Sequence, residues 1–161
     1  MNTPPAFMKG WSIMKKYIAY GSNLNVEQMK HRCPNARILC TGEIEDYRLL
    51  FKGSLSGNYL TIEPCKGRTV PVVVWEVTDD CEYSLDVYEG FPRFYRKEYV
   101  PIKTQGGIMK DAFAYIMNGH EIGLPTERYM RTCLSGYASF DFDPEILWIA
   151  AEESNPESVQ E

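Results

Sequence analysis

The sequence has no long apolar run and no excess of basic residues. Its 161 residues contain 17 Lys and Arg against 22 Asp and Glu, which gives a net charge of −5 and a pI near 5.2. Nucleic acids and anionic membranes both attract a basic face, so we expect neither as a partner. No apolar stretch approaches the roughly 20 residues of a membrane-spanning helix, and the N-terminus has no hydrophobic core typical of a signal peptide. We therefore expect a soluble, cytoplasmic protein that acts on a small molecule.

Cysteine and histidine are also sparse, and they form no pattern that binds a metal. The five cysteines are odd in number, widely spaced and without a C-x-x-C pair, so neither a disulfide framework nor a zinc site is indicated. They are Cys33, Cys40, Cys65, Cys81 and Cys133. His31 lies near Cys33 but has no further ligands beside it. The sequence predicts reduced thiols, no metal and no cofactor.

Length and composition favour one domain. A chain of this size with 44% hydrophobic residues can bury one core but not two. Residues 1–13 contain Pro4-Pro5 and no periodic pattern, so we expect a disordered leader or an upstream start there. Residues 14–152 form the expected domain, and 153–161 an acidic, frayed tail. We expect a monomer or a weak homodimer.

Hydrophobic periodicity predicts an α+β domain around a small sheet or barrel. The expected strands are 17–20, 38–41, 47–51, 59–63, 70–77, 95–103 and 108–117, and the expected helices are 26–32, 79–89, 127–134 and 143–151. The polar link 42–46 and a turn at 65–68 should separate strands. The short connections favour six or seven mostly antiparallel strands.

The stretch Tyr20-Gly21-Ser22-Asn23-Leu24 joins a predicted strand to a predicted helix. Such a loop presents backbone N–H groups at a helix N-terminus, where they can hold a carboxylate or phosphate. Gly21 allows close approach of a ligand or a left-handed conformation. Most strand–glycine–helix junctions are only junctions, so spacing alone leaves the role of this loop open.

Glu89 occupies an unusual position for a carboxylate. It lies in the last turn of a predicted helix, against the negative end of the helix dipole, and shares a face with Glu82 and Asp86. Like charges and partial burial would raise its pKa toward neutrality, which suits proton transfer. The alternative is a solvated acidic face.

Several motifs in this order resemble the γ-glutamylcyclotransferase-like family. The resemblance covers about residues 16–142 and is carried by Tyr20 to Leu24, Gly42 with Tyr47-Arg48-Leu49, Val70 to Val77, Leu85 to Arg96, Tyr129 and Gly136-Tyr137. It implies a small closed β-barrel with flanking helices.

The resemblance also implies a reaction. Glu89 would be the catalytic acid and base, and the loop Tyr20 to Leu24 would hold the α-carboxylate of a γ-glutamyl group. The α-amine would attack its own γ-carbonyl, expelling an amine and leaving 5-oxoproline. Tyr95 and Tyr115 are supporting candidates for the same pocket. The leaving amine stays open, with the loops 54–58 and 119–126 as the segments expected to contact it.

Two other interpretations remain open at this point. A non-catalytic ligand-binding or interaction module could use the same fold, since fold does not fix function. Ordinary amide hydrolysis would need an activated nucleophile, but neither His31 nor His120 is placed by any motif to serve Ser22 or a cysteine. The basic and aromatic run 93–97 alone does not indicate nucleic-acid binding in an acidic chain.

Overall fold

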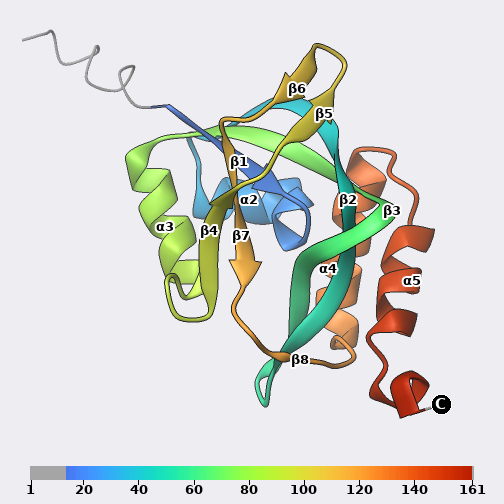
Figure 1. The fold of residues 1–161 in the computed structure, drawn as a ribbon. Coiled ribbons are helices and arrows are strands. Elements are labelled where there is room, and N and C mark those ends of the chain that lie inside the picture. Colours follow the sequence, from blue (N-terminus) through green and yellow to red (C-terminus); the bar gives the residue numbers. More distant parts are fainter. Residues whose placement is uncertain (1–13, 161) are drawn as a thin grey trace, which may run out of the picture.

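Two long strands dominate the sheet. In the computed structural model, which describes residues 14–160, β2 (Arg37–Ser54) and β3 (Gly57–Val77) pair antiparallel along their length through a two-residue turn (Figure 1). The predicted breaks at 42–46 and 65–68 are wrong, because the pair bends there instead. Asp46 and Gly67 take positive φ angles of 62° and 85°, and the Gly67 N–H donates to the Asp46 carboxylate at 2.9 Å. This bend curls the sheet.

The remaining strands complete a half-barrel. They are β1 (Lys15–Ala19), β4 (Tyr95–Tyr99), β5 (Ile102–Thr104), β6 (Gly107–Met109), β7 (Ala112–Met117) and β8 (Glu121–Ile122). Within residues 14–160 the order is β4-β7-β1-β3-β2-β5-β6, β8 pairs with β2, and β1–β7 is the parallel pair. The α+β class and the mostly antiparallel pairing are confirmed. The predicted closed barrel is a half-barrel, since the strand path ends at β4 and β6 without pairing them.

The predicted 95–103 and 108–117 hairpin is present, but each arm is split in two. Its tip is the small β5–β6 hairpin, which projects from the top of the sheet in Figure 1. Below it, β4 and β7 pair from Tyr95 to Tyr99 and bring Tyr115 opposite Lys97.

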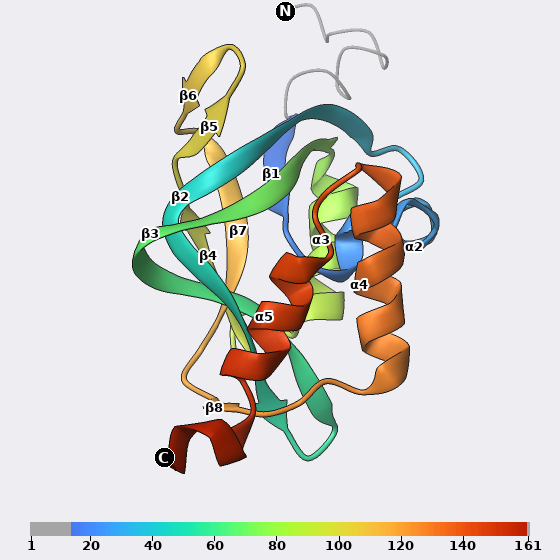
Figure 2. The same ribbon diagram turned by 90° about the vertical axis from the view of Figure 1, so that its right-hand side faces the viewer.

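Four α-helices and two 3-10 turns accompany the sheet in the described chain: η1 (Ser22–Leu24), α2 (Val26–Arg32), α3 (Asp79–Glu89), α4 (Glu127–Ser139), α5 (Glu145–Glu153) and η2 (Pro156–Gln160). Figure 2 shows α4 and α5 side by side, with α2 and α3 beyond them. Thr78 caps α3 by accepting the Cys81 N–H at 3.2 Å. Gly90 ends α3 with φ 65°, the left-handed conformation that glycine adopts without strain. None of these helices is long and apolar enough to cross a membrane.

The prediction that all cysteines are reduced thiols is wrong for one pair. Cys33, just after α2, and Cys81, in the first turn of α3, form a disulfide across 48 residues. The spacing rules missed it because the two cysteines are distant in sequence and meet only when α2 packs against α3. Cys40, Cys65 and Cys133 are free.

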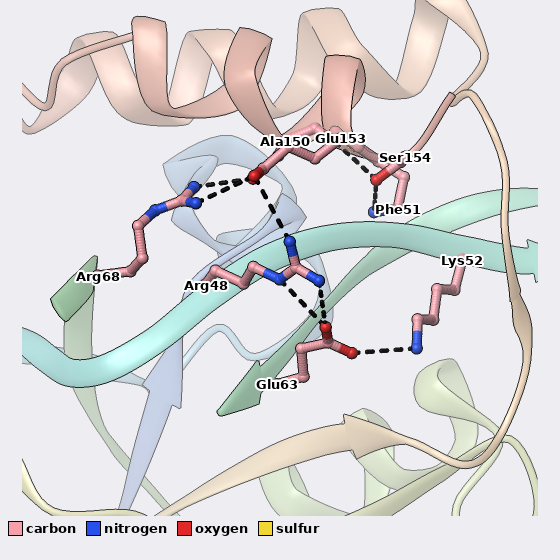
Figure 3. Close-up of polar contacts among 8 residues, drawn as sticks. All are labelled: Arg48, Phe51, Lys52, Glu63, Arg68, Ala150, Glu153 and Ser154. Carbon is pink, nitrogen blue, oxygen red and sulfur yellow. Dashed lines mark hydrogen bonds and ion pairs between the residues drawn. The ribbon is translucent and has the colours of Figure 1, made fainter. Parts of the chain in front are cut away.

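The C-terminal segment is anchored, contrary to the predicted fraying. Glu153 pairs with Arg68 at 2.8 Å and with Arg48 at 3.5 Å (Figure 3). Ser154 is fully buried, where its hydroxyl accepts the Phe51 N–H at 2.8 Å and donates to the Ala150 carbonyl at 2.6 Å. These bonds hold the end of α5 on β2 and β3. The expectations for residues 1–13 and for 161 fall outside the described residues.

Candidate active site

A cavity of about 380 Å³ opens between the start of η1, the end of α3 and the sheet. It is lined by Tyr17, Ile18, Tyr20, Gly21, Ser22, Asn23, Ser56, Tyr59, Leu60, Val87, Tyr88, Glu89, Gly90, Phe94, Tyr95, Tyr115 and Tyr129. Of the eight residues predicted for the site, the cavity brings seven together. The exception is Leu24.

Leu24 faces the protein interior. Its side chain is fully buried, and it lies so close to α4 that a Cβ on Gly136 would come within 2.8 Å of it. Its N–H donates to the Gly21 carbonyl at 3.0 Å, which closes the 3-10 turn. The Leu24 amide is therefore already used, and the prediction that it takes part in the anion site is wrong.

The amides of Ser22 and Asn23 differ from that of Leu24. Within residues 14–160 neither donates to a backbone or side-chain acceptor, and both residues line the cavity. The Asn23 side chain donates to the Tyr17 hydroxyl at 2.8 Å and accepts from Arg32. These two side-chain hydrogen bonds hold the η1 turn in place. The backbone N–H groups of Ser22 and Asn23, two cavity-lining residues, are therefore left without an acceptor in the described chain, which suits the binding of an anion.

Gly21 does not adopt the left-handed conformation offered as one possibility, since its φ is −126°. A Cβ placed on it would lie 3.4 Å from the Leu60 Cβ and 3.5 Å from the Tyr129 hydroxyl, which are ordinary contacts. Glycine here therefore keeps space open between η1, β3 and α4, and larger side chains would fill it.

Glu89 is the last residue of α3 and the one carboxylate among the cavity-lining residues. Its side chain makes no hydrogen bond or ion pair with any described residue. Burial raises its pKa to about 7, and the nearby positive charge of Arg32 partly offsets that rise. A group with this pKa can both accept and return a proton near neutral pH.

The like-charge explanation for Glu89 is not the operative one. Glu82 pairs with Lys15 at 2.6 Å and with Lys97 at 2.7 Å, and Asp86 pairs with Lys97 at 2.8 Å. Both of these carboxylates are therefore neutralised by lysines on β1 and β4. Glu89, one turn further on, is left unpaired at the cavity, and burial dominates its pKa.

The three predicted tyrosines line the cavity, but their hydroxyl protons are engaged within the protein. Tyr20 donates to the Tyr115 carbonyl, Tyr95 to the Leu60 carbonyl at 2.8 Å, and Tyr115 to the Asp86 carboxylate at 2.6 Å. Burial raises the pKa of all three, so they are neutral phenols. They shape the wall, and their oxygen lone pairs remain available as acceptors.

The prediction also missed Tyr88, which lines the cavity, and Arg32, which packs on it. Tyr88, beside Glu89, contacts Ser22 through a hydroxyl–hydroxyl hydrogen bond of 3.2 Å and so ties the end of α3 to η1. Arg32 lies over the Tyr88 ring, 3.6 Å from its centre. Neither contact has a sequence signal, because each depends on how two helices pack. Of the two loops expected to contact the leaving group, 54–58 contributes Ser56, whereas no residue of 119–126 lines the cavity.

Comparisons with known proteins identify the family of this chain. The family model described as gamma-glutamyl cyclotransferase, AIG2-like, matches residues 17–138. The gamma-glutamylcyclotransferases of Homo sapiens and Mus musculus are 31% and 30% identical over 128 residues, which are 74% of this chain and 68% of each relative. The chain therefore belongs to the gamma-glutamyl cyclotransferase, AIG2-like family, as the motifs indicated.

Solved structures agree at the level of the fold. A structure described as a gamma-glutamyl cyclotransferase is 29% identical, with a TM-score of 0.73 over 79% of this chain and 80% of its own. YkqA from Bacillus subtilis is 18% identical and has a TM-score of 0.74 over 93% of this chain and 57% of its own, which shows a shared fold.

Proposed function

We propose that this protein is a γ-glutamylcyclotransferase that cleaves γ-glutamyl amides by intramolecular cyclisation and releases 5-oxoproline. The observation that supports this most directly is the pairing of functions in one cavity. Glu89 is an unpaired carboxylate with a pKa of about 7, and Ser22 and Asn23 line the same cavity with unused amides. An acid/base group and an anion cradle are what this reaction needs from a protein.

In the proposed reaction, the amides of Ser22 and Asn23 hold the α-carboxylate of the glutamyl group. Glu89 takes a proton from the α-ammonium, and the freed amine attacks the γ-carbonyl carbon. A five-membered ring closes through the new C–N bond. As the original amide C–N bond breaks, Glu89 returns the proton to the departing nitrogen. The ring nitrogen then gives its second proton to the Glu89 carboxylate, which passes it to the released amine or to water. The products are 5-oxoproline and a free amine.

The protein's main contribution in this scheme is positioning. Attack within one molecule has a high effective molarity once the substrate is held curled. Tyr20, Tyr95 and Tyr115 restrict the cavity around the glutamyl half, and their neutral oxygens can accept hydrogen bonds from the ammonium group. Tyr88 supports the geometry through its contact with Ser22.

The compartment and the assembly are part of the same proposal. We place the protein in the cytoplasm, as a monomer or weak homodimer with a small-molecule γ-glutamyl substrate. Three of its five cysteines are free, which fits a reducing compartment, but the Cys33–Cys81 bond needs an oxidant. Alkylation of thiols in intact cells, followed by mass analysis of the Cys33 and Cys81 peptides, tests the compartment. Light scattering during gel filtration tests the assembly.

The experiment that tests the reaction separates cyclisation from hydrolysis. The protein is incubated with γ-glutamyl amides and with their N-acetyl forms, and the acidic product is identified by mass. We expect 5-oxoproline from the free-amine substrates and no turnover of the acetylated ones, because acetylation removes the nucleophile. Free glutamate as the first product, or turnover of an acetylated substrate, would overturn the proposal.

A further inference from the structure

The residues lining the cavity differ in exposure, and this difference gives the cavity an inner part and a rim. Tyr17, Tyr20 and Tyr115 are buried, whereas Ser56, at the β2–β3 turn, and Val87, near the end of α3, are exposed. If the glutamyl group occupies the inner part beside Glu89, as the proposed function requires, the leaving amine lies at the rim. The rim residues therefore determine which amines are accepted.

The rim is largely aromatic. The Tyr59 ring meets the Phe94 ring edge-on, with centres 6.3 Å apart, and the Tyr129 ring edge-on at 5.1 Å. Tyr59 and Phe94 are both half-buried, so part of each ring faces the opening. The His120 ring lies tilted against the Phe94 ring, with centres 4.5 Å apart, but His120 is not one of the lining residues. Such a surface gains from contact with apolar and aromatic groups.

The backbone of the rim offers little to an anion. The Ser56 N–H donates to the Ser54 hydroxyl at 3.4 Å, the Gly90 N–H to the Val87 carbonyl at 3.3 Å, and the Phe94 N–H to the Gly90 carbonyl at 2.9 Å. These donors are all used within the protein, in contrast to the amides of Ser22 and Asn23. A carboxylate at the rim would find none of these three free.

The side chains of the rim offer no cation either. Among the described residues that line the cavity there is no Lys or Arg, and Glu89 supplies the one formal charge. Arg32 lies against Tyr88, but its guanidinium is held by Asn23 and by Gln28 at 2.7 Å. A second carboxylate on the substrate would therefore lie near the negative charge of Glu89 without compensation.

We infer that the leaving group is an uncharged apolar amine, best an arylalkylamine, and that γ-glutamyl amino acids, whose leaving groups carry a carboxylate, are poorer substrates. The aromatic rim formed by Tyr59, Phe94 and Tyr129 is the specificity-determining surface. This inference rests on the proposed function, because it names the substrate class of the same site.

Four substrates test the inference as two matched pairs. γ-Glutamylphenethylamide and γ-glutamylphenylalanine differ by one carboxylate on the leaving group, as do γ-glutamylethylamide and γ-glutamylalanine. We expect kcat/KM to be at least about tenfold higher for the carboxylate-free member of each pair, and the phenyl ring to add about tenfold more. The ring effect should appear mainly in KM.

Two sets of variants locate the effect at the rim. Phe94→Ala should remove most of the preference for the phenyl ring, whereas Tyr59→Phe, which keeps the ring, should retain it. Ser56→Arg places a cation at the rim and should raise kcat/KM for γ-glutamylphenylalanine about tenfold. Leu55→Arg is the matched control, because Leu55 is fully exposed on the same turn, does not line the cavity and makes no side-chain hydrogen bond.

The outcomes separate this inference from the proposed function. Equal or better turnover of the carboxylated substrates, or a Leu55→Arg effect as large as that of Ser56→Arg, would overturn the substrate class while leaving cyclisation intact. If no member of either pair yields 5-oxoproline, the proposed function itself fails, and this inference fails with it.

Discussion

Replacing Glu89 with glutamine should remove activity and stabilise the fold at the same time. The amide keeps the shape of the side chain but cannot accept a proton from the substrate ammonium, so turnover should fall by about 10²- to 10⁴-fold. Substrate affinity should change much less, because the proposed carboxylate cradle, Ser22 and Asn23, is untouched. Lost activity together with added stability is the combination expected when a partly buried, unpaired carboxylate serves the reaction.

The stability effect follows from the pKa of about 7, against an ordinary value of 4.5. Between these two values the folded protein holds a proton that the unfolded chain has released, so stability falls as the pH rises through this window. At pH 8 the ionised Glu89 destabilises the fold by about 3 kcal/mol at 1.36 kcal/mol per pKa unit, and by about 2 kcal/mol once its partial exposure to water is counted.

The assay is thermal unfolding of Glu89→Gln and the parent at several pH values. At pH 8 the variant should melt roughly 4 to 8 °C higher, since 1 kcal/mol corresponds to about 2 to 4 °C in a domain of this size. Below pH 4.5 the two melting temperatures should converge, because the parent is then protonated in both states.

Glu82→Gln is the matched control on the same helix. Burial acts against ionisation of Glu82, but its hydrogen bonds with Lys15 and Lys97 outweigh that and lower its pKa. A lowered carboxyl pKa adds stability above the unfolded pKa, so this variant should melt lower than the parent at pH 8. If Glu89→Gln kept turnover within a few-fold of the parent, or melted lower at pH 8, the account of Glu89 would be refuted.

Three further perturbations have defined outcomes. Gly21→Ala should keep KM within about threefold, because its Cβ makes ordinary contacts, whereas Gly21→Val should raise KM more than about tenfold by filling the space between η1 and β3; equal KM values would contradict this. Arg32→Gln removes a positive charge that lowers the Glu89 pKa, so the acid limb of the kcat/KM–pH profile should move to higher pH, and an unmoved limb would contradict the assignment. Ser154→Ala leaves the buried Phe51 N–H unpaired and should cost about 1 to 3 kcal/mol of unfolding free energy without changing kcat; an unchanged melting temperature would show that the tail is not anchored.

Local rules predicted most of the elements that carry the site. The helices predicted at 26–32 and 79–89 and the apolar strand predicted at 70–77 each have a signal within a few residues, and the structure contains the corresponding elements. The sequence did not predict that β2 and β3 are continuous. The largely polar segment 42–46 was predicted to be a link between strands. In the structure, a bulge and the hydrogen bond from Gly67 to Asp46 let the strand bend there without ending, and both depend on contacts between distant residues.

The chemistry of the site was only partly accessible from the sequence, for a related reason. The family motifs located Glu89 and the η1 loop, but the pairing of Glu82 and Asp86 with lysines depends on β1 and β4 meeting α3 in space. The same holds for the Leu24 amide, which closes a turn, and for the Cys33–Cys81 bond. Hydrophobic periodicity predicts which face of a helix or strand a residue lies on, but not which other element packs against that face.

The contacts around α3 explain how the fold tolerates a destabilising carboxylate at its end. The helix begins at a capped residue beside the Cys33–Cys81 bond, and its middle is held by lysines at Glu82 and Asp86. Each of these interactions lies one to three turns before Glu89, so none neutralises it. The ion pairs that stabilise α3 are thus separated along the helix from the carboxylate proposed to act in the reaction. A cation placed beside Glu89 instead would lower its pKa, stabilise the fold and remove the proton affinity on which the proposed reaction depends.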